Sequence, residues 1–429
     1  MGIAFDVPVA PGIADPAALL RGLDPLQVRR PLAGFLGLEP CDTAVTVERT
    51  HFSATRPTTS QYRVSTPGNA TDTVILAEFV GSNAESHVAA EAARLSKSRR
   101  SQIAKGEPAP LLADLDLGMV FRRPGLDAKL PGLKLLYDPA SAVEAAAEAI
   151  GSSTRGLSVT ATLRAHRLGK RAVVQLDLHG ARAGRIFVRL RPTSSTSGAS
   201  AYTRHQEITA ALTDVAGITV PQPLRHDADL GAAFFAALPG KAPIFEGAAG
   251  TNAAEAVARA LTSIIAHGPE AGTPYTVADE LAMLGGWSDR VCTVFPALAG
   301  PVGKALAAVE AALFRFEVVR PRPCHRDFHE GQILIHEGCA GVLDFDTYRL
   351  ADPALDIGNL IAHLRMRGLC ENRSLGRIED TFRRSMLSYG KQQNVEAWTR
   401  AAVLRLGCIY AFTSQGSKLA RALFREAAE

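Results

Sequence analysis

The sequence predicts an α+β protein in which a β-rich part comes first and a mostly helical part follows. Two observations carry this prediction. Short apolar runs bounded by Gly and Pro are frequent up to about residue 240 and are typical of strands. From Thr251 onward, apolar residues recur at helical spacing, as in Val257, Leu261 and Ile264.

The first part of the chain is expected to form an α+β unit. A helical pattern from Ala17 to Leu36 is interrupted by Pro25 and Pro31. Three predicted strands and a predicted helix follow, at residues 44–47, 61–64, 74–80 and 84–99.

A second set of strands resembles the first. Three strands are predicted at residues 157–163, 171–178 and 185–190, with a helix at 201–213. An offset of about 114 residues brings Val45 onto Val159 and Gln61 onto Gln175. Either the unit is duplicated, or two simple three-stranded meanders, each followed by a helix, look alike.

Within the helical part, two short apolar runs predict a β-hairpin that brings three polar side chains together. The runs 332–335 and 340–343 are joined by residues 336–339. Asp327 precedes the first run, Gln332 begins it, and Asp344 follows the second. Because an antiparallel hairpin brings its two ends together, Gln332 and Asp344 could share an ion while Asp327 faces a hydroxyl group. Phosphoryl transfer requires such oxygen ligands and such a carboxylate.

Composition excludes several classes of protein. The 429 residues are 47% hydrophobic and 21% charged with a net charge of +4, which describes two or three globular domains. No basic cluster interleaved with aromatic residues predicts a nucleic-acid partner. The six scattered cysteines include no Cys-x-x-Cys pair, which favours a reducing compartment over a zinc site or disulfide framework. Without a signal peptide pattern or a long apolar span, a cytoplasmic location away from membranes is expected, and the oligomeric state stays open.

Three ordered motifs resemble those of a known family, the aminoglycoside phosphotransferase and choline kinase group of protein-kinase-like enzymes. Residues 324–334 resemble its Brenner-type loop, residues 342–346 its metal-binding segment, and residues 352–360 the helix opening that follows. The resemblance implies a bilobal kinase-like fold. We therefore expect an N-terminal accessory or cap domain at 1–151, a β-rich small lobe at 152–240 and a helical catalytic lobe at 241–429.

The resemblance also implies roles for the hairpin residues. Asp327 matches the catalytic base, and Gln332 and Asp344 match the Mg²⁺ ligands, with ATP as phosphate donor between the lobes. His325 is expected to brace the loop by hydrogen bonding. Asp356 is expected to interact with the start of its helix and with the loop. For His329 and Asp346, a role near substrate or a second metal and a role in stabilising the loop both stay open.

The nucleotide end of the resemblance rests on Arg189 and Glu207. Arg189 takes the place of the family's strand lysine, and Glu207 lies at a suitable distance along the following helix to position it. Arginine keeps the charge but is longer and planar. No Gly-x-Gly-x-x-Gly is present, and Lys170 and Arg171 in the preceding turn are either surface charges or phosphate ligands. In the first β-rich unit the matching position is about Ala77, so that unit is expected to be a cap or a degenerate small lobe without a nucleotide.

Together these features predict an ATP-dependent phosphotransferase acting on a small-molecule hydroxyl. The Gln at position 332, where the family more often has Asn, is similar to the maltokinase and glucosamine kinase branch, which favours a sugar or amino sugar as acceptor. One alternative is a nucleotide-binding regulatory pseudokinase without turnover. A second, a kinase of protein Ser or Thr, is disfavoured because only five residues separate Asp346 from Asp352 and leave no activation segment.

Overall fold

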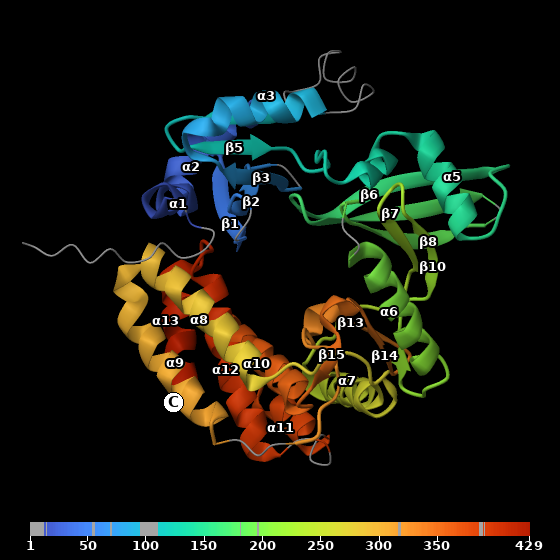
Figure 1. Ribbon diagram of the computed structural model, residues 1–429, viewed down its shortest axis with the longest axis vertical. Coiled ribbons are helices and arrows are strands. Elements are labelled where there is room, and N and C mark those ends of the chain that lie inside the picture. The colour runs from blue at the N-terminus through green and yellow to red at the C-terminus, as the bar shows by residue number, and fades with distance from the viewer. Residues whose placement is uncertain are drawn as a thin grey trace, which may run out of the picture. The chain divides into compact units, whose positions relative to one another are not determined.

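The computed structural model describes residues 13, 15–53, 56–68, 71–94, 110–180, 182–194, 197–315, 319–385, 389 and 391–429. The chain forms two compact units. The first comprises residues 1–128, 282–306 and 407–425, and the second comprises residues 129–281, 307–406 and 426–429. Each unit combines helices with its own β-sheet (Figure 1), and the predicted α+β class is confirmed.

The first unit is built on a five-stranded antiparallel sheet in the order β1-β2-β3-β5-β4. Its strands are β1 (Ala44–His51), β2 (Thr59–Ser65), β3 (Thr73–Phe79), β4 (Leu111–Asp114) and β5 (Met119–Arg122). Its N-terminal helices are α1 (Pro16–Leu23), α2 (Pro25–Leu36) and α3 (Ala84–Arg94). Side chains of α2 and of β1, β2, β3 and β5 share one apolar core. The predicted helix at 84–99 is present to Arg94, and residues 95–99 lie outside the described part of the chain.

The predicted break at Pro31 does not occur. Helix α2 begins at Pro25. N–H groups in the first turn of a helix have no intrahelical acceptor, so a proline there costs no hydrogen bond. The helix continues through Pro31 and keeps Val28 and Leu32 fully buried. Burial of this apolar face therefore outweighs the hydrogen bond that Pro31 removes.

Helices from the C-terminal half of the chain complete the first unit. They belong to α8 (Val277–Val294), α9 (Ala299–Leu313), α12 (Gln392–Tyr410) and α13 (Gly416–Ala428). The backbone N–H of Val47 donates to Oγ of Ser414 at 2.7 Å, and the Ser414 N–H donates to the Val47 carbonyl at 3.0 Å. The Phe52 ring meets the rings of Trp287 and Phe412 edge-on. Strand β1 and segments far away in sequence thus form one structural unit.

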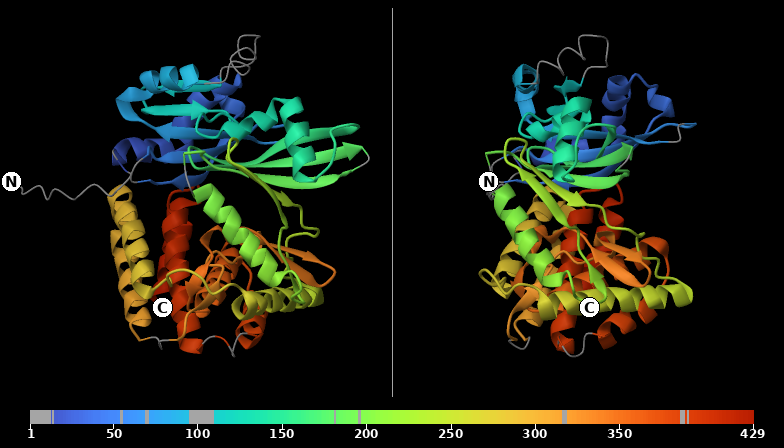
Figure 2. Two further views of the ribbon diagram at one scale, coloured as in Figure 1. Left: turned by 45° about the vertical axis from the view of Figure 1, so that its right-hand side comes forward. Right: turned by 90° about the vertical axis from the view of Figure 1, so that its right-hand side faces the viewer.

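The second unit contains another five-stranded antiparallel sheet, in the order β6-β7-β8-β11-β10. Its strands are β6 (Leu157–Arg167), β7 (Arg171–Gly180), β8 (Gly184–Leu190), β10 (Pro223–Asp227) and β11 (Ala232–Ala236). The 3-10 helix η3 (Pro131–Leu136) and helix α5 (Pro139–Ala149) share the core of this sheet (Figure 2). Residues 131–149 thus pack with the second sheet because their leucines and alanines face it, which favours a boundary near residue 128 over the predicted one at 151.

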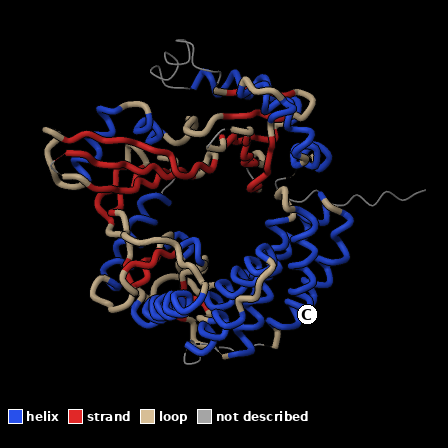
Figure 3. The backbone as a smooth tube through the Cα atoms, turned by 180° about the vertical axis from the view of Figure 1, so that it is seen from behind, coloured by secondary structure: helices blue, strands red, loops and turns tan. Residues whose placement is uncertain are grey.

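The two sheets have the same topology. In each, three consecutive antiparallel strands are followed by a helix, and the last two strands add to the third strand in reversed order. The helix after the third strand is α3 in the first unit and α6 (Ser197–Leu212) in the second. Figure 3 colours the strands of both sheets red. This shared strand order supports duplication over a chance likeness of two meanders.

Strand register corrects the position that matches Arg189. Gln61 pairs with Leu76 in the first sheet, and Gln175 pairs with Phe187 in the second. Glu78 lies two residues after Leu76 on β3, and Arg189 lies two residues after Phe187 on β8. The matching residue is therefore Glu78 rather than Ala77, because the loop before the third strand differs in length. An acidic residue stands where the second sheet has a cation.

The rest of the second unit is mostly helical and carries two small sheets. Its helices are α7 (Gly247–His267), α10 (Ala354–Glu371) and α11 (Gly376–Ser385), with α12 shared between the units. Strands β12 (Arg322–Cys324) and β15 (Arg349–Ala351) pair with each other, and β13 (Ile333–His336), β14 (Cys339–Val342) and β9 (Ile218–Thr219) form the order β13-β14-β9. The predicted hairpin at 332–343 is therefore present, with Glu337 and Gly338 at positive φ in its two-residue turn. No helix in the described residues has the length and apolar character needed to cross a membrane.

Candidate active site

The loop after β12 is fixed by a buried carboxylate. Asp356, in the first turn of α10, is fully buried and accepts hydrogen bonds from the backbone N–H groups of His325 and Arg326, both at 2.6 Å. Arg326 has a φ of 68°, a conformation that a non-glycine residue rarely adopts. The two bonds to Asp356 hold the loop in this conformation and confirm the role predicted for Asp356.

Burial of Asp356 is reflected in its proton affinity. Burial raises the pKa of the Asp356 carboxyl group, while the nearby His325 and the two backbone N–H groups oppose that rise without cancelling it. The buried carboxylate thus depends on its two backbone hydrogen-bond donors.

The His325 side chain connects the loop to the hairpin. Its Nε2 lies 2.7 Å from the carbonyl oxygen of Leu343, so this nitrogen carries the proton and donates. Its Nδ1 then accepts from the Asp327 N–H at 3.3 Å. The hydroxyl of Thr347 donates to the His325 carbonyl at 2.8 Å. These contacts confirm the predicted bracing role of His325.

Asp327 lies on this braced loop with a half-buried side chain. Within the described part of the chain, its carboxylate has no hydrogen-bond or ion-pair partner. The next residue, Phe328, is fully buried, and its carbonyl accepts a hydrogen bond from Asn359 Nδ2 at 3.0 Å. Arg405 in turn donates to Asn359. The backbone at Asp327 is therefore fixed on both sides, while its carboxylate is available to a ligand.

The hairpin brings Gln332 and Asp344 to the same end. Ile333 pairs with Val342, and the Leu343 N–H donates to the Gln332 carbonyl at 2.8 Å. Asp344, the next residue, has a φ of 56°, which turns the chain sharply after the strand. No hydrogen bond to the side chain of Gln332 is found among the described residues. An amide oxygen and a carboxylate at one hairpin end are suitable ligands for a hard cation such as Mg²⁺.

Arg189 contacts the carboxylates of Asp344 and Asp346. Its Nη2 donates to Oδ1 of Asp344 at 2.7 Å and lies 2.5 Å from Oδ1 of Asp346. The structure therefore joins the predicted phosphate-binding residue to the predicted metal-binding residue. The guanidinium is only 21% exposed, so these contacts are partly protected from water.

Two more arginines complete this group, which we call the arginine–aspartate cluster: Arg171, Arg189, Arg191, Asp344 and Asp346. Nη2 of Arg191 donates to Oδ2 of Asp346 at 2.6 Å, and Nη1 of Arg171 reaches the same oxygen at 3.0 Å. Burial raises the pKa of Asp346, but the three guanidinium groups outweigh burial and lower it overall. The sequence pattern left the role of Arg171 open and did not indicate Arg191, although two residues after Arg189 an extended chain returns to the same face.

The predicted partner of Arg189, Glu207, is not brought to it. Glu207 is exposed, and no ion pair in the described residues joins the two. His205, two residues earlier on this helix, is buried, and its Nε2 donates to the Pro221 carbonyl at 2.8 Å. Two residues on a helix are about 200° apart around its axis, so burial of His205 turns Glu207 outward. Asp344 and Asp346 take the place of the expected glutamate.

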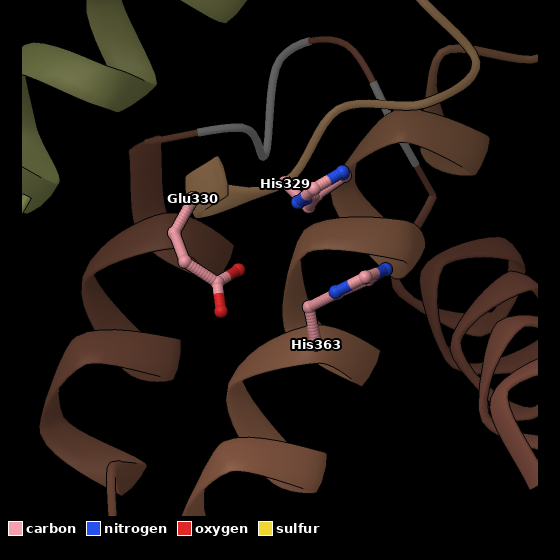
Figure 4. Close-up of side chains that lie close together, drawn as sticks. All are labelled: His329, Glu330 and His363. Carbon is pink, nitrogen blue, oxygen red and sulfur yellow. The ribbon is translucent and has the colours of Figure 1, made fainter. Parts of the chain in front are cut away.

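A further group of polar side chains lies on the other side of the loop. His329, Glu330 and His363 bring one potential ligand atom each within 4.8 Å of one another (Figure 4). The two imidazole rings are stacked at 4.4 Å with an angle of 8° between their planes. The lone pair of each ring nitrogen lies in the plane of its ring, and because the two rings are stacked and nearly parallel, they cannot both direct a lone pair at one ion in this arrangement. His329 Nδ1 accepts from the Gly331 N–H at 3.1 Å, which favours the loop-stabilising role for His329.

Tyr275 supports the loop from the opposite direction. The Arg326 guanidinium lies over the Tyr275 ring at 3.5 Å from its centroid. The Tyr275 hydroxyl donates to Oε2 of Glu280 at 2.9 Å, and Glu280 is buried. Burial, followed by the Glu280 charge, raises the pKa of Tyr275, so this hydroxyl stays a donor.

Comparison with known proteins identifies the family. The model of the phosphotransferase enzyme family matches residues 170–385, half of the chain, and includes the arginine–aspartate cluster and the braced loop. The chain belongs to this family. Membership confirms the predicted class of enzyme, a small-molecule phosphotransferase, and the kinase-like α+β fold. No curated protein matches the sequence of this phosphotransferase.

Solved structures are similar at low sequence identity. Aminoglycoside phosphotransferase APH(4)-Ia has a TM-score of 0.47 at 13% identity, over 67% of this chain and 98% of that one. The amicoumacin kinase hAmiN, in complex with AMP-PNP, Ca²⁺ and Ami, has a TM-score of 0.47 at 13% identity, over 69% and 95%. A choline/ethanolamine kinase family protein from Mesorhizobium loti has a TM-score of 0.43 at 15% identity, over 62% and 86%.

Proposed function

We propose that this phosphotransferase moves the terminal phosphate of ATP to a hydroxyl group of a sugar or amino sugar, with Mg²⁺ as cofactor. The observation that carries the proposal is the joint geometry of Asp327 and the arginine–aspartate cluster. The Asp327 carboxylate, which has no partner among the described residues, lies on a braced loop, and Arg189 contacts the Asp344 carboxylate at the end of the adjoining hairpin. The residues proposed for both halves of a phosphoryl-transfer site thus belong to one unit, which supports the proposal.

The residues fit the nucleotide and the metal chemically. Gln332 and Asp344 offer oxygen atoms, which Mg²⁺ prefers. Arg189 offers a fork of N–H donors that matches phosphate oxygens. When bound, ATP supplies the phosphoryl group and Mg²⁺ neutralises charge on its phosphates.

Each of the chain's own residues has a distinct task in this proposal. Asp327 accepts a hydrogen bond from the acceptor hydroxyl, orients it and takes its proton. His325 and Asp356 keep the backbone at Asp327 in place. Arg189 holds phosphate oxygens and offsets the negative charge that develops during transfer.

The choice of a sugar or amino sugar rests on Gln332 and its likeness to the maltokinase and glucosamine kinase branch. Regulatory binding without turnover is the alternative. The presence of Asp327 and Asp344 with favourable surroundings supports turnover.

An acceptor panel tests the proposal. Purified protein with Mg²⁺-ATP is offered sugars, amino sugars, aminoglycosides and amino alcohols, and phosphorylated product is detected by mass spectrometry. We expect product with at least one sugar or amino sugar, and D327N should abolish it while nucleotide binding persists. The matched control D380N changes an exposed aspartate on α11 and should keep wild-type turnover. Nucleotide binding without product on any acceptor would favour the pseudokinase.

A further inference from the structure

The arginine–aspartate cluster contains two arginines, Arg171 and Arg191, in addition to Arg189. Arg189 lies on β8, Arg191 directly follows that strand two residues later, and Arg171 begins the neighbouring strand β7. The register that pairs Ala172 with Leu190 brings Arg171 next to Arg191. Sheet geometry therefore directs three guanidinium groups to one place, where Asp344 and Asp346 meet them.

The cluster carries a net charge of one positive unit, because three arginines face two aspartates. Asp346 alone lies within 3.0 Å of all three guanidinium groups. In this state a metal ion approaching Asp344 meets carboxylates that are already neutralised and a surplus of positive charge. A triphosphate, in contrast, offers oxygen atoms to all three guanidinium forks.

Two of these arginines border a recess beside helix α6. A small cavity is lined by Arg189, Arg191, Asp346, Tyr202 and His226. Arg171 is 40% exposed and Arg191 is 18% exposed, so one of them can be reached from solvent and the other from the cavity side.

On this basis, and resting on the proposed function, we propose that Arg171 and Arg191 join Arg189 in a three-arginine phosphate clamp that exchanges Asp344 and Asp346 for the nucleotide's phosphate oxygens. Until that exchange, the guanidinium groups occupy the carboxylates and exclude the metal ion. Metal binding at Asp344 therefore requires the nucleotide, whereas the nucleotide can bind without metal.

Direct binding measurements test the clamp without relying on turnover. ATP in the presence of EDTA is titrated into wild type, R191Q, R171Q and R185Q by isothermal calorimetry. Loss of one hydrogen-bonded charge should weaken binding of metal-free ATP about tenfold or more in R191Q and R171Q. Arg185 lies on the same strand β8, is 51% exposed and pairs with Asp177, so R185Q should bind ATP like wild type.

Metal binding gives the opposite expectation. Mn²⁺ is titrated without nucleotide and followed by the electron paramagnetic resonance signal of the free ion. Wild type should bind Mn²⁺ weakly, and R191Q should bind it more tightly because Asp346 loses a competing cation. Circular dichroism melting curves confirm that each variant is folded, and R171Q on the other strand gives an independent variant if R191Q unfolds.

The outcomes separate the two proposals. If wild type binds ATP and both R191Q and R171Q bind it equally well, the clamp is wrong while the proposed function stands. If wild type binds Mn²⁺ alone as tightly as it does with AMP-PNP, the carboxylates are not blocked and the clamp is again wrong. If wild type binds no ATP with or without Mg²⁺, the proposed function fails and the clamp fails with it.

Discussion

Nη2 of Arg189 donates a 2.7 Å hydrogen bond to Oδ1 of Asp344, although the two residues are 155 positions apart in the chain. The proposed phosphate ligand and the proposed metal ligand are thus direct partners. The same guanidinium nitrogen reaches Asp346 at 2.5 Å. A planar fork can divide its donors among carboxylates and phosphate oxygens, which a single ammonium group on a flexible stem does less well.

This relationship predicts that Arg189 is needed for turnover as an arginine. R189M removes the charge and should lower kcat/KM for ATP by about a hundredfold, an effect typical of losing one preorganised charge near developing negative charge. R189K keeps the charge but not the fork, and its loss should be smaller, about tenfold. Steady-state kinetics with ATP as the varied substrate measures both. If R189M had wild-type kinetics, Arg189 would not contribute to ATP binding or turnover.

Glu207 should be dispensable. Because Glu207 is exposed and makes no ion pair with Arg189 in the described residues, E207Q should leave kcat and KM for ATP within about twofold of wild type, as is usual for exposed residues away from contacts. The measurement is the same ATP titration, with R189M as the sensitive reference. A loss in E207Q as large as that in R189M would mean that Glu207 moves to Arg189 when the nucleotide binds.

Local patterns explain why much of the site could be predicted. The loop, hairpin and helix start lie within residues 324–360, and short-range spacing fixes how Asp327, Gln332 and Asp344 follow one another. The hairpin turn at Glu337 and Gly338 places both ends together without any long-range contact. The roles of Asp327 and Gln332 nevertheless stay predictions until variants are measured.

Long-range features were beyond the sequence pattern. The partner of Arg189 is predicted on the following helix. Which face of that helix turns inward depends on which of its residues are buried. Apolar residues are spread too evenly around α6 for its sequence to show that His205 is buried and Glu207 exposed. Arg191 could have been found from strand alternation alone. Segments near Trp287 and Ser414 pack with β1 and Phe52. These contacts join residues more than 200 positions apart, and no local sequence pattern predicts them.

Asp356 should be important for stability. Replacement by Asn leaves one acceptor oxygen for two backbone N–H groups at 2.6 Å and directs an NH₂ donor at one of them. Losing a hydrogen bond to a charged group costs about 1.5–3 kcal/mol, so D356N should lower the free energy of unfolding by that amount. Urea denaturation measures it, and D380N, at an exposed position, should stay within about 0.5 kcal/mol of wild type. Equal stability of D356N and D380N would show that the loop does not depend on this carboxylate.

His363 should make stability depend on pH. Burial, then the neighbouring His329 and Arg405, hold the pKa of His363 well below 6.5 in the folded protein. Below pH 6.5 the unfolded chain therefore binds more protons at this residue than the folded protein does, and stability falls as the pH falls toward the folded-state pKa. The loss is at most about 1.4 kcal/mol per pH unit for one such group.

H363Q removes this contribution, so its melting temperature should fall less than that of wild type between about pH 7 and pH 5. His329, whose pKa burial also lowers, still contributes in the variant. The control H336Q changes an exposed histidine and should keep the wild-type pH dependence. Parallel pH profiles for wild type and H363Q would mean that His363 is protonated to the same extent in the folded and unfolded states.

The charge reversal between the two sheets predicts that the first unit contributes stability and not nucleotide binding. Glu78, at the position that matches Arg189, pairs with Arg122 at 2.6 Å, and Arg122 also pairs with Glu91 at 2.9 Å. Arg122 is 2% exposed. R122M removes the buried cation that joins these two carboxylates and leaves Glu91 only Arg94 and Glu78 only His87, which should cost about 3–5 kcal/mol.

Two measurements on R122M separate stability from binding. Hydrogen–deuterium exchange of peptides from β1 to β5 should show lost protection, whereas the affinity for Mg²⁺-ATP should be unchanged because no residue of the proposed nucleotide site is altered. The matched variant R63M removes an arginine that is 50% exposed and pairs with Glu48, and it should cost at most about 1 kcal/mol. If R122M weakened ATP binding while exchange in β1 to β5 stayed normal, the first sheet would have to be regarded as part of the nucleotide site, and the acidic residue at the position of Arg189 would need another explanation.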